Sequence, residues 1–324
     1  MRTSRRSFLK AGLAFLAGAG LGGCSGRRDS GVETSGVEAM IKSFPEEIPG
    51  ASRVVKYPVK GAKTCVVHIR QEHLVGFNPN SYVDGAHGFH INSQEELERV
   101  NYYQEQIYKI LKYLKDKEIT SSVYIEGMTP EIWDRINREG LLEKILYPIN
   151  EELEDKLCDF EQKLSQEIIW DVPKGSSADE VRKGYLNRKN QLEKEYEAFR
   201  EKYKFAGGGA LRLVYGGELS IAGFEDANVL DSAYRELDET GRVGKIGLDG
   251  REDSLLESIG KSGEEFAFVV LGGQHAFGGK KSCGLDYSLK GRMSYKDNLY
   301  EWNRNNPDNN LALIEITPER YEEF

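Results

Sequence analysis

The order of apolar and polar residues predicts strands that alternate with helices along most of the chain. β-Branched runs at 64–69 and 121–125 fit buried strands, and apolar residues recur at helical spacing between them, over 93–114. Further apolar strands are expected at 265–271 and 311–314. Such alternation indicates an α/β fold, with a layered sheet flanked by helices.

A glycine-rich segment suggests that this sheet is mixed. Residues 211–215 and 219–222 are typical of two strands joined by a glycine pair, as in a hairpin. A hairpin pairs its strands antiparallel, whereas strands joined by helices pair in parallel. Helices are then expected at 227–237 and 253–259.

Residues 150–205 form a separate pattern of two amphipathic helices. Apolar positions recur at helical spacing over 153–168 and again over 181–203, and Asp171-Val-Pro-Lys-Gly175 separates the two runs. We therefore predict a hairpin of two antiparallel helices, either a helical insertion in the α/β domain or a lid. Its apolar faces either pack within the protein or bind a partner.

Capping signals support three of the predicted helix starts. Ser93 precedes Glu96, and Ser177 precedes Glu180, in the spacing of a capping box. Thr129-Pro130 places a capping side chain before a proline at the first helical position.

The N-terminus carries an export signal. Arg5-Arg6 is followed by Phe8-Leu9 and by an apolar run, 11–23, which is shorter than the roughly 20 residues of a membrane span. This pattern matches a twin-arginine signal peptide. Leu21-Gly22-Gly23-Cys24 matches a lipobox, in which Cys24 becomes the lipidated first residue.

These signals divide the chain into three parts. Residues 1–23 are the expected signal peptide, residues 24–50 the lipidated cysteine and a flexible tether, and residues 51–324 a single α/β domain with the helical insertion. The protein is expected to be a membrane-anchored lipoprotein, exported by the twin-arginine route to the periplasm or the cell surface.

The net charge argues against nucleic acid as a partner. The chain carries −9 at pH 7, and loss of the signal peptide, with four basic residues and no acidic one, makes it −13. An acidic surface repels nucleic acid and anionic lipid. The expected link to the membrane is therefore the lipid anchor alone.

Three predicted strands end on residues that can carry chemistry, which are His68, Glu126 and His275. The carboxyl ends of strands in α/β sheets open onto ligand sites, and imidazole and carboxylate groups meeting there can bind a divalent metal. Each residue also has a structural alternative, such as helix capping by Glu126. Arg251 can bind an anion or pair with neighbouring acids.

Other polar residues are further candidates. Glu225 either reaches the same site or, with Asp226, caps the following helix. His73, His87 and His90 lie in a glycine-rich loop, which either contributes ligands or is simply solvated.

The order of these motifs resembles the TIKI/TraB superfamily, in which two GxxH motifs flank a strand-end glutamate and an arginine. Gly272-Gly-Gln-His275 fits the second motif, and Glu126 and Arg251 fit the residues between. His68 fits the first histidine, although Cys65 stands where the family has glycine. The resemblance covers about residues 54–317.

The resemblance implies a metal-dependent hydrolase of peptide or ester bonds, with a small-molecule or peptide substrate. His68, Glu126 and His275 would bind Mn, Co or Zn, and Glu126 and Arg251 would be catalytic. The ChaN-like branch implies instead a haem- or metal-binding lipoprotein without catalysis. A surface interaction protein that has lost its chemistry is a third alternative.

Overall fold

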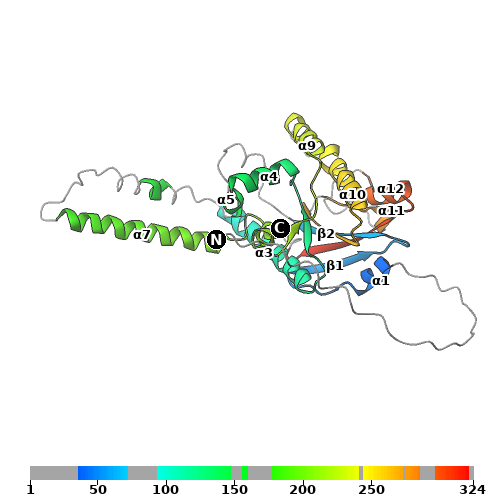
Figure 1. Ribbon diagram of the computed structural model, residues 1–324, viewed down its shortest axis with the longest axis horizontal. Coiled ribbons are helices and arrows are strands. Elements are labelled where there is room, and N and C mark those ends of the chain that lie inside the picture. The colour runs from blue at the N-terminus through cyan, green and yellow to red at the C-terminus, as the bar shows by residue number, and fades with distance from the viewer. Residues whose placement is uncertain are drawn as a thin grey trace, which may run out of the picture. The chain divides into compact units, whose positions relative to one another are not determined.

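The computed structural model describes residues 36–71, 93–146, 155–159, 177–240, 244–272, 275–284 and 296–320. Within them, a six-stranded mixed sheet carries helices on both faces (Figure 1). The predicted α/β class is confirmed.

The sheet has the strand order β1-β6-β2-β5-β3-β4. Its strands are β1 (Ala51–Tyr57), β2 (Thr64–Gln71), β3 (Ser122–Ile125), β4 (Ser220–Ile221), β5 (Phe266–Gly272) and β6 (Leu311–Pro318). β1 pairs antiparallel with β6, and the strands from β6 to β4 are parallel. The parallel strands therefore have their carboxyl ends at one edge of the sheet.

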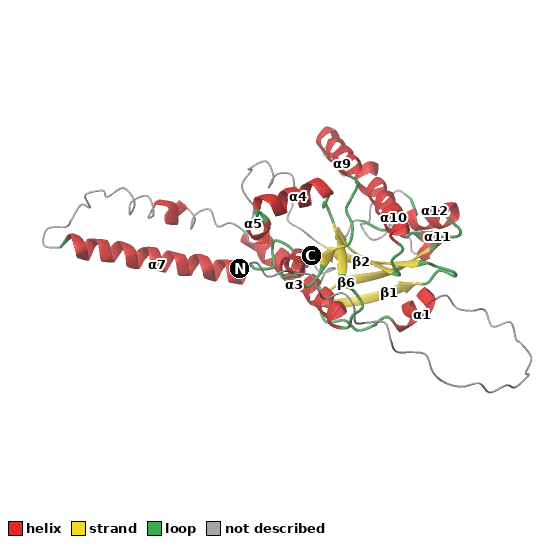
Figure 2. Ribbon diagram, viewed as in Figure 1, coloured by secondary structure: helices red, strands yellow, loops and turns green. Residues whose placement is uncertain are grey.

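Successive side chains of each strand enter opposite layers. In β2, Cys65, Val67 and Ile69 join the larger apolar core, and Val66 joins the second. The larger core is covered by α1 (Gly36–Ser43), α3 (Gln94–Asp116), α4 (Pro130–Glu139), α5 (Leu142–Leu146) and α8 (Gly209–Tyr215). The second is covered by α10 (Arg251–Ser262) and α12 (Asn298–Asn305). Figure 2 shows α10 and α12 on one side of the strands and α1 and α3 on the other.

The predicted helix caps are confirmed. The Ser93 hydroxyl accepts from the Glu96 amide at the start of α3, and Thr129 accepts from Ile132 at the start of α4. Ser177 and Glu180 form a reciprocal capping box at the start of α7 (Ala178–Lys202). These starts depend on side chains within three residues, so the local sequence is sufficient to predict them.

The prediction of a hairpin at 211–222 was wrong in its first half. Residues 209–215 form helix α8, and only Ser220–Ile221 is a strand, which pairs in parallel with β3. A short apolar run fits a buried helix as well as a strand, and packing against α3 decides here for the helix. The mixed character of the sheet comes instead from β1.

Two predicted boundaries also differ from the structure. β2 continues to Gln71, so His68 lies within the strand and not near its end. The folded part begins before residue 51, because Val37 and Ile41 of α1 are buried in the larger core. Both shifts have the same origin, since burial extends beyond the most obviously apolar runs.

The two helices predicted after β4 are both present, as α9 (Ala227–Thr240) and α10. Between them, a π-helical turn, η1 (Ile246–Gly250), leads directly into α10. The short α11 (Lys280–Cys283) follows β5. Arg251, the first residue of α10, directly follows this π-helical turn.

The second helix of the predicted insertion is α7. Its last residue, Lys202, forms an ion pair with Glu98 of α3, with Nζ 3.1 Å from Oε1. Of the first, residues 155–159 are helical and the remainder lies outside the described residues. Among the helices that the structure describes, none combines the length and apolar character that a bilayer span needs.

The contact of α8 with α3 gives a test of the fold. A Cβ on Gly209 would overlap the backbone carbonyl of Gln104, so we expect Gly209→Ala to destabilise the protein by about 1–3 kcal/mol. Gly184, within α7, has open space around its Cα, and Gly184→Ala is the matched control. Thermal unfolding should show a lower Tm for Gly209→Ala and an equal or higher Tm for Gly184→Ala. Equal losses in both variants would contradict this packing.

Candidate functional site

The candidate site lies where β2, β5 and β3 end. Gln71 is opposite Gly272 in the ladder between β2 and β5, and Glu126 directly follows β3. These are carboxyl ends of parallel strands, the edge at which the sequence predicted the site.

Glu126 is held by three donors from three elements. Its Oε1 accepts from Arg251 Nη1 at 3.0 Å, and its Oε2 accepts from the Gln71 side chain at 3.0 Å and from the Gly272 amide at 2.5 Å. Charge-assisted hydrogen bonds of this kind fix the orientation of a carboxylate. Glu126 is therefore the point at which the strand ends and α10 are joined.

Arg251 joins Glu126 to a second carboxylate. Its Nε and Nη2 both donate to Glu225 at 2.7 Å, in a bidentate pair, and Glu225 also accepts from the Gly127 amide at 2.6 Å. Burial alone would lower the pKa of Arg251, but Glu225 and Glu126 raise it above its usual value. The guanidinium therefore stays charged between the two carboxylates.

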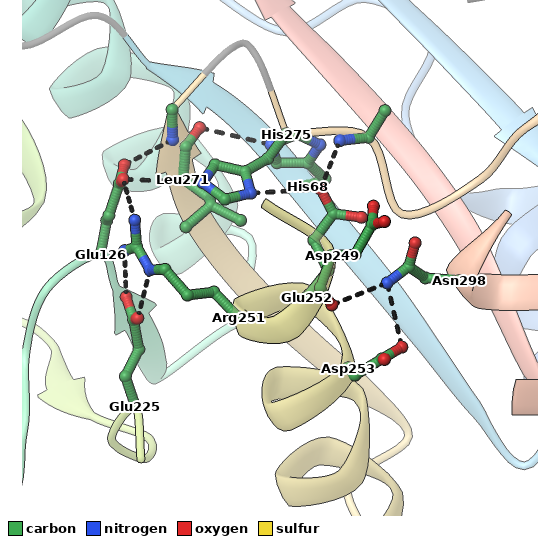
Figure 3. A network of polar contacts seen from close by, with 12 residues as sticks. His68, Glu126, Glu225, Asp249, Arg251, Glu252, Asp253, Leu271, His275 and Asn298 are labelled. Atoms are coloured by element: carbon green, nitrogen blue, oxygen red, sulfur yellow. Dashed lines mark hydrogen bonds and ion pairs between the residues drawn. The ribbon is translucent and has the colours of Figure 1, made fainter. Parts of the chain in front are cut away.

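His275 continues this network from the other side of Glu126 (Figure 3). Its Nδ1 lies 3.1 Å from Glu252 Oε1, and its Nε2 lies 3.8 Å from Glu126 Oε1. Glu252 Oε1 also accepts from the Ala276 amide at 3.0 Å. Because a carboxylate only accepts, we assign the proton to Nδ1, which leaves the lone pair of Nε2 directed towards Glu126.

The exposed fractions indicate which end of the network a solute can reach. The side chains of Glu126 and Arg251 are 12% and 11% exposed, whereas Glu252 is fully buried. Glu252 is therefore shielded from a solute and contacts His275, which lies closer to Glu126. The gap of 3.8 Å between His275 Nε2 and Glu126 Oε1 is too long for a direct hydrogen bond and suits a bridging water.

His68 lies deeper than the sequence predicted. It is fully buried on the face that α10 and α12 cover, with Nε2 3.3 Å from the Leu271 carbonyl. A carbonyl only accepts, so we assign a proton to this Nε2. The Nδ1 atom lies 4.0 Å from Glu315 of the neighbouring strand β6.

Glu126 and His68, two of the predicted metal ligands, contact other protein groups in the structure. Both oxygens of Glu126 accept hydrogen bonds, one of them from a guanidinium, and His68 Nε2 faces a carbonyl. In the part of the chain that the structure describes, no three His, Cys, Asp or Glu residues are grouped to hold a metal. The metal centre stays a prediction, and His73, His87 and His90 lie outside the described residues.

The structure resolves the alternatives for Glu225 and Asp226. Glu225 pairs with Arg251, while Asp226 accepts from the amides of Asn228 and Val229 at the start of α9. Both roles considered from the sequence are therefore present, divided between neighbouring residues. Tyr234 lies close to this cluster, and burial raises its pKa to about 12.

Sequence analysis missed Glu252 and Gln71, which complete the network. Glu252 shares one face of α10 with Leu255, Leu256 and Ile259. A carboxylate on the apolar stripe of a helix is a recognisable signal, because burial of a charge requires a partner. Gln71 gave no comparable signal.

Comparisons with protein-family models, with curated proteins and with solved structures find no match to this chain. The resemblance to the TIKI/TraB superfamily therefore stays a prediction that depends on its quoted motifs.

The Glu126–Arg251–Glu225 cluster predicts a coupled loss of stability. Arg251→Met leaves two buried carboxylates without their cation, and we expect it to cost about 3–5 kcal/mol in urea unfolding. Adding Glu225→Gln to Arg251→Met should cost less than the two single changes summed.

Lys261→Met provides the matched control, because it removes an exposed pair with Glu257 and should change the unfolding free energy little. Strict additivity of Arg251→Met and Glu225→Gln would show that the buried carboxylate is not coupled to the guanidinium.

Proposed function

We propose that this protein is a hydrolase of ester or amide bonds in which His275 is the general base. The observation that carries the proposal is the placement of His275, with Nδ1 3.1 Å from buried Glu252 and Nε2 3.8 Å from Glu126 Oε1. A histidine oriented by a carboxylate, with its other nitrogen directed at a water position, is the arrangement that general-base catalysis requires.

In the proposed reaction, water lies between His275 Nε2 and Glu126 Oε1. Nε2 takes a proton from the water as its oxygen attacks the carbonyl carbon, and later gives this proton to the leaving group. Glu252 stabilises the imidazolium through Nδ1, and Glu126 orients the water through a hydrogen bond.

Arg251 supports this arrangement by holding Glu126 and Glu225. Three of the five N–H groups of Arg251 donate to these carboxylates. In this proposal the other two can donate to negative charge that develops on the substrate, which is the role expected for Arg251 from the sequence. Contact of Arg251 with substrate remains a prediction.

The first test is a screen of full-length protein, purified in detergent, against chromogenic esters and short peptides. We expect His275→Ala to lower kcat/KM by about 10²–10⁴-fold, because the general base is lost. Glu252→Gln should lower kcat more than it changes KM, since it acts through His275. Hydrolysis that is unchanged in His275→Ala would overturn the proposal.

Glu257→Gln, an exposed change on the same helix, is the control and should retain activity. The screen is repeated after chelation and after adding Mn²⁺, Co²⁺ or Zn²⁺. The proposed steps do not need these ions, so activity that appears only with one of them would favour the metal centre implied by the resemblance.

We also propose that the protein works as an exported, lipid-anchored protein. Arg5-Arg6, the apolar run that follows and Cys24 support this, and all of them lie outside the described residues. Cys24→Ser should move the protein from the membrane to the soluble fraction or leave it unprocessed, because lipid attachment is lost.

Cys158→Ser is the control for this change, since Cys158 is an exposed cysteine far along the chain from the signal. Replacing Arg5 and Arg6 together by lysine should stop export. Cys24→Ser protein that is processed to the mature size and still fractionates with the membrane would contradict the anchor.

A further inference from the structure

His68 is a buried histidine that the proposed reaction does not use. It lies within β2, opposite Val269 of β5 and Glu315 of β6, and its side chain has no exposed surface. A fully buried imidazole needs hydrogen-bond partners to offset the loss of water. Its contacts therefore indicate what it does.

Two of these contacts lie on either side of His275 along the chain. His68 Nε2 is 3.3 Å from the Leu271 carbonyl, and its ring packs edge-on against Phe277 with centroids 5.3 Å apart. Between them, the His275 amide donates to the Gly272 carbonyl at 2.9 Å. His68 thus contacts the chain both before and after His275.

The contact with Leu271 also reaches Glu126 through one peptide group. The carbonyl of Leu271 and the amide N–H of Gly272 belong to the same planar peptide unit. The carbonyl faces His68, and the N–H donates to Glu126 Oε2 at 2.5 Å. Because the peptide is planar, its rotation away from His68 would also turn its N–H away from Glu126.

We propose that His68 is a positioning residue, which fixes the Leu271–Gly272 peptide and so sets the distance between Glu126 and His275. In this role Nε2 is protonated and donates a hydrogen bond to the Leu271 carbonyl. His68 therefore acts through the backbone and not on substrate. The inference rests on the proposed function for its catalytic consequence, but the structural link can be measured without substrate.

Three substitutions separate the roles available to His68. Gln places an amide donor close to the position of Nε2, Asn places one close to Nδ1, and Leu has no donor at a similar volume. If His68 positions the peptide, His68→Gln retains the contact, whereas His68→Asn and His68→Leu lose it. If His68 instead binds metal or transfers a proton, none of the three substitutions would retain its function.

The first measurement is hydrogen exchange of the Gly272 amide by NMR in full-length protein. We expect exchange to be at least about 10-fold faster in His68→Asn and His68→Leu, and close to that of the parent protein in His68→Gln, because the amide is released from Glu126. Equal exchange in all variants overturns the proposal, whatever the activity of the protein.

The second measurement is the rate of ester or peptide hydrolysis. His68→Asn should lower kcat by about 10–100-fold with little change in KM, and His68→Gln should restore most of the loss. His68→Gln as inactive as His68→Leu would overturn the positioning role. Altered exchange in a protein that hydrolyses nothing would instead overturn the proposed function and leave the peptide contact supported.

Comparing the Gln and Asn variants protects the test from a general loss of folding. Both put an amide into the same buried position, so a folding defect common to polar substitution would appear in both. Circular dichroism and the Tm are measured for each. Similar thermal stability with different Gly272 exchange is the expected result.

Discussion

The site depends on one buried cation placed between two carboxylates. Arg251 joins Glu126, at the end of β3, to Glu225, in the segment before α9, and it does so from the first residue of α10. Without the guanidinium, both acids would lie in a poorly solvated region with uncompensated charge. Three segments that are far apart in sequence must therefore assemble together, and their assembly places Glu126 beside His275.

The other constraint is the Leu271–Gly272 peptide, which connects the interior of the sheet to its edge. Its carbonyl faces His68 within the second core, and its N–H meets Glu126. Because the peptide is planar, the two contacts cannot vary independently. Buried Glu252 adds a further link by holding the proton-bearing nitrogen of His275. The geometry between Glu126 and His275 is thus supported from the sheet on one side and from α10 on the other.

Local sequence patterns were sufficient for elements whose signals lie within a few residues. Ser93, Thr129 and Ser177 begin helices as predicted, because a capping side chain bonds to an amide only two or three residues away. The run at 211–215 was misassigned, because its apolar residues suit either a strand or a helix until α3 packs against it. His68 was placed near a strand end because the β-branched run stops at Ile69, yet Arg70 and Gln71 continue β2 and are buried.

The sequence by itself determined the α/β class, most element positions, and the strand-end location of Glu126 near His275. These follow from periodicity and from the rule that parallel strands end at one edge of a sheet. Only the tertiary structure decided the partners, such as Glu225 and Glu126 on Arg251, Glu252 on His275, and the Leu271 carbonyl on His68. These partners are far apart in the sequence, so no periodic pattern of residues predicts them. They meet because packing of the layers brings particular buried charges and donors within hydrogen-bonding distance.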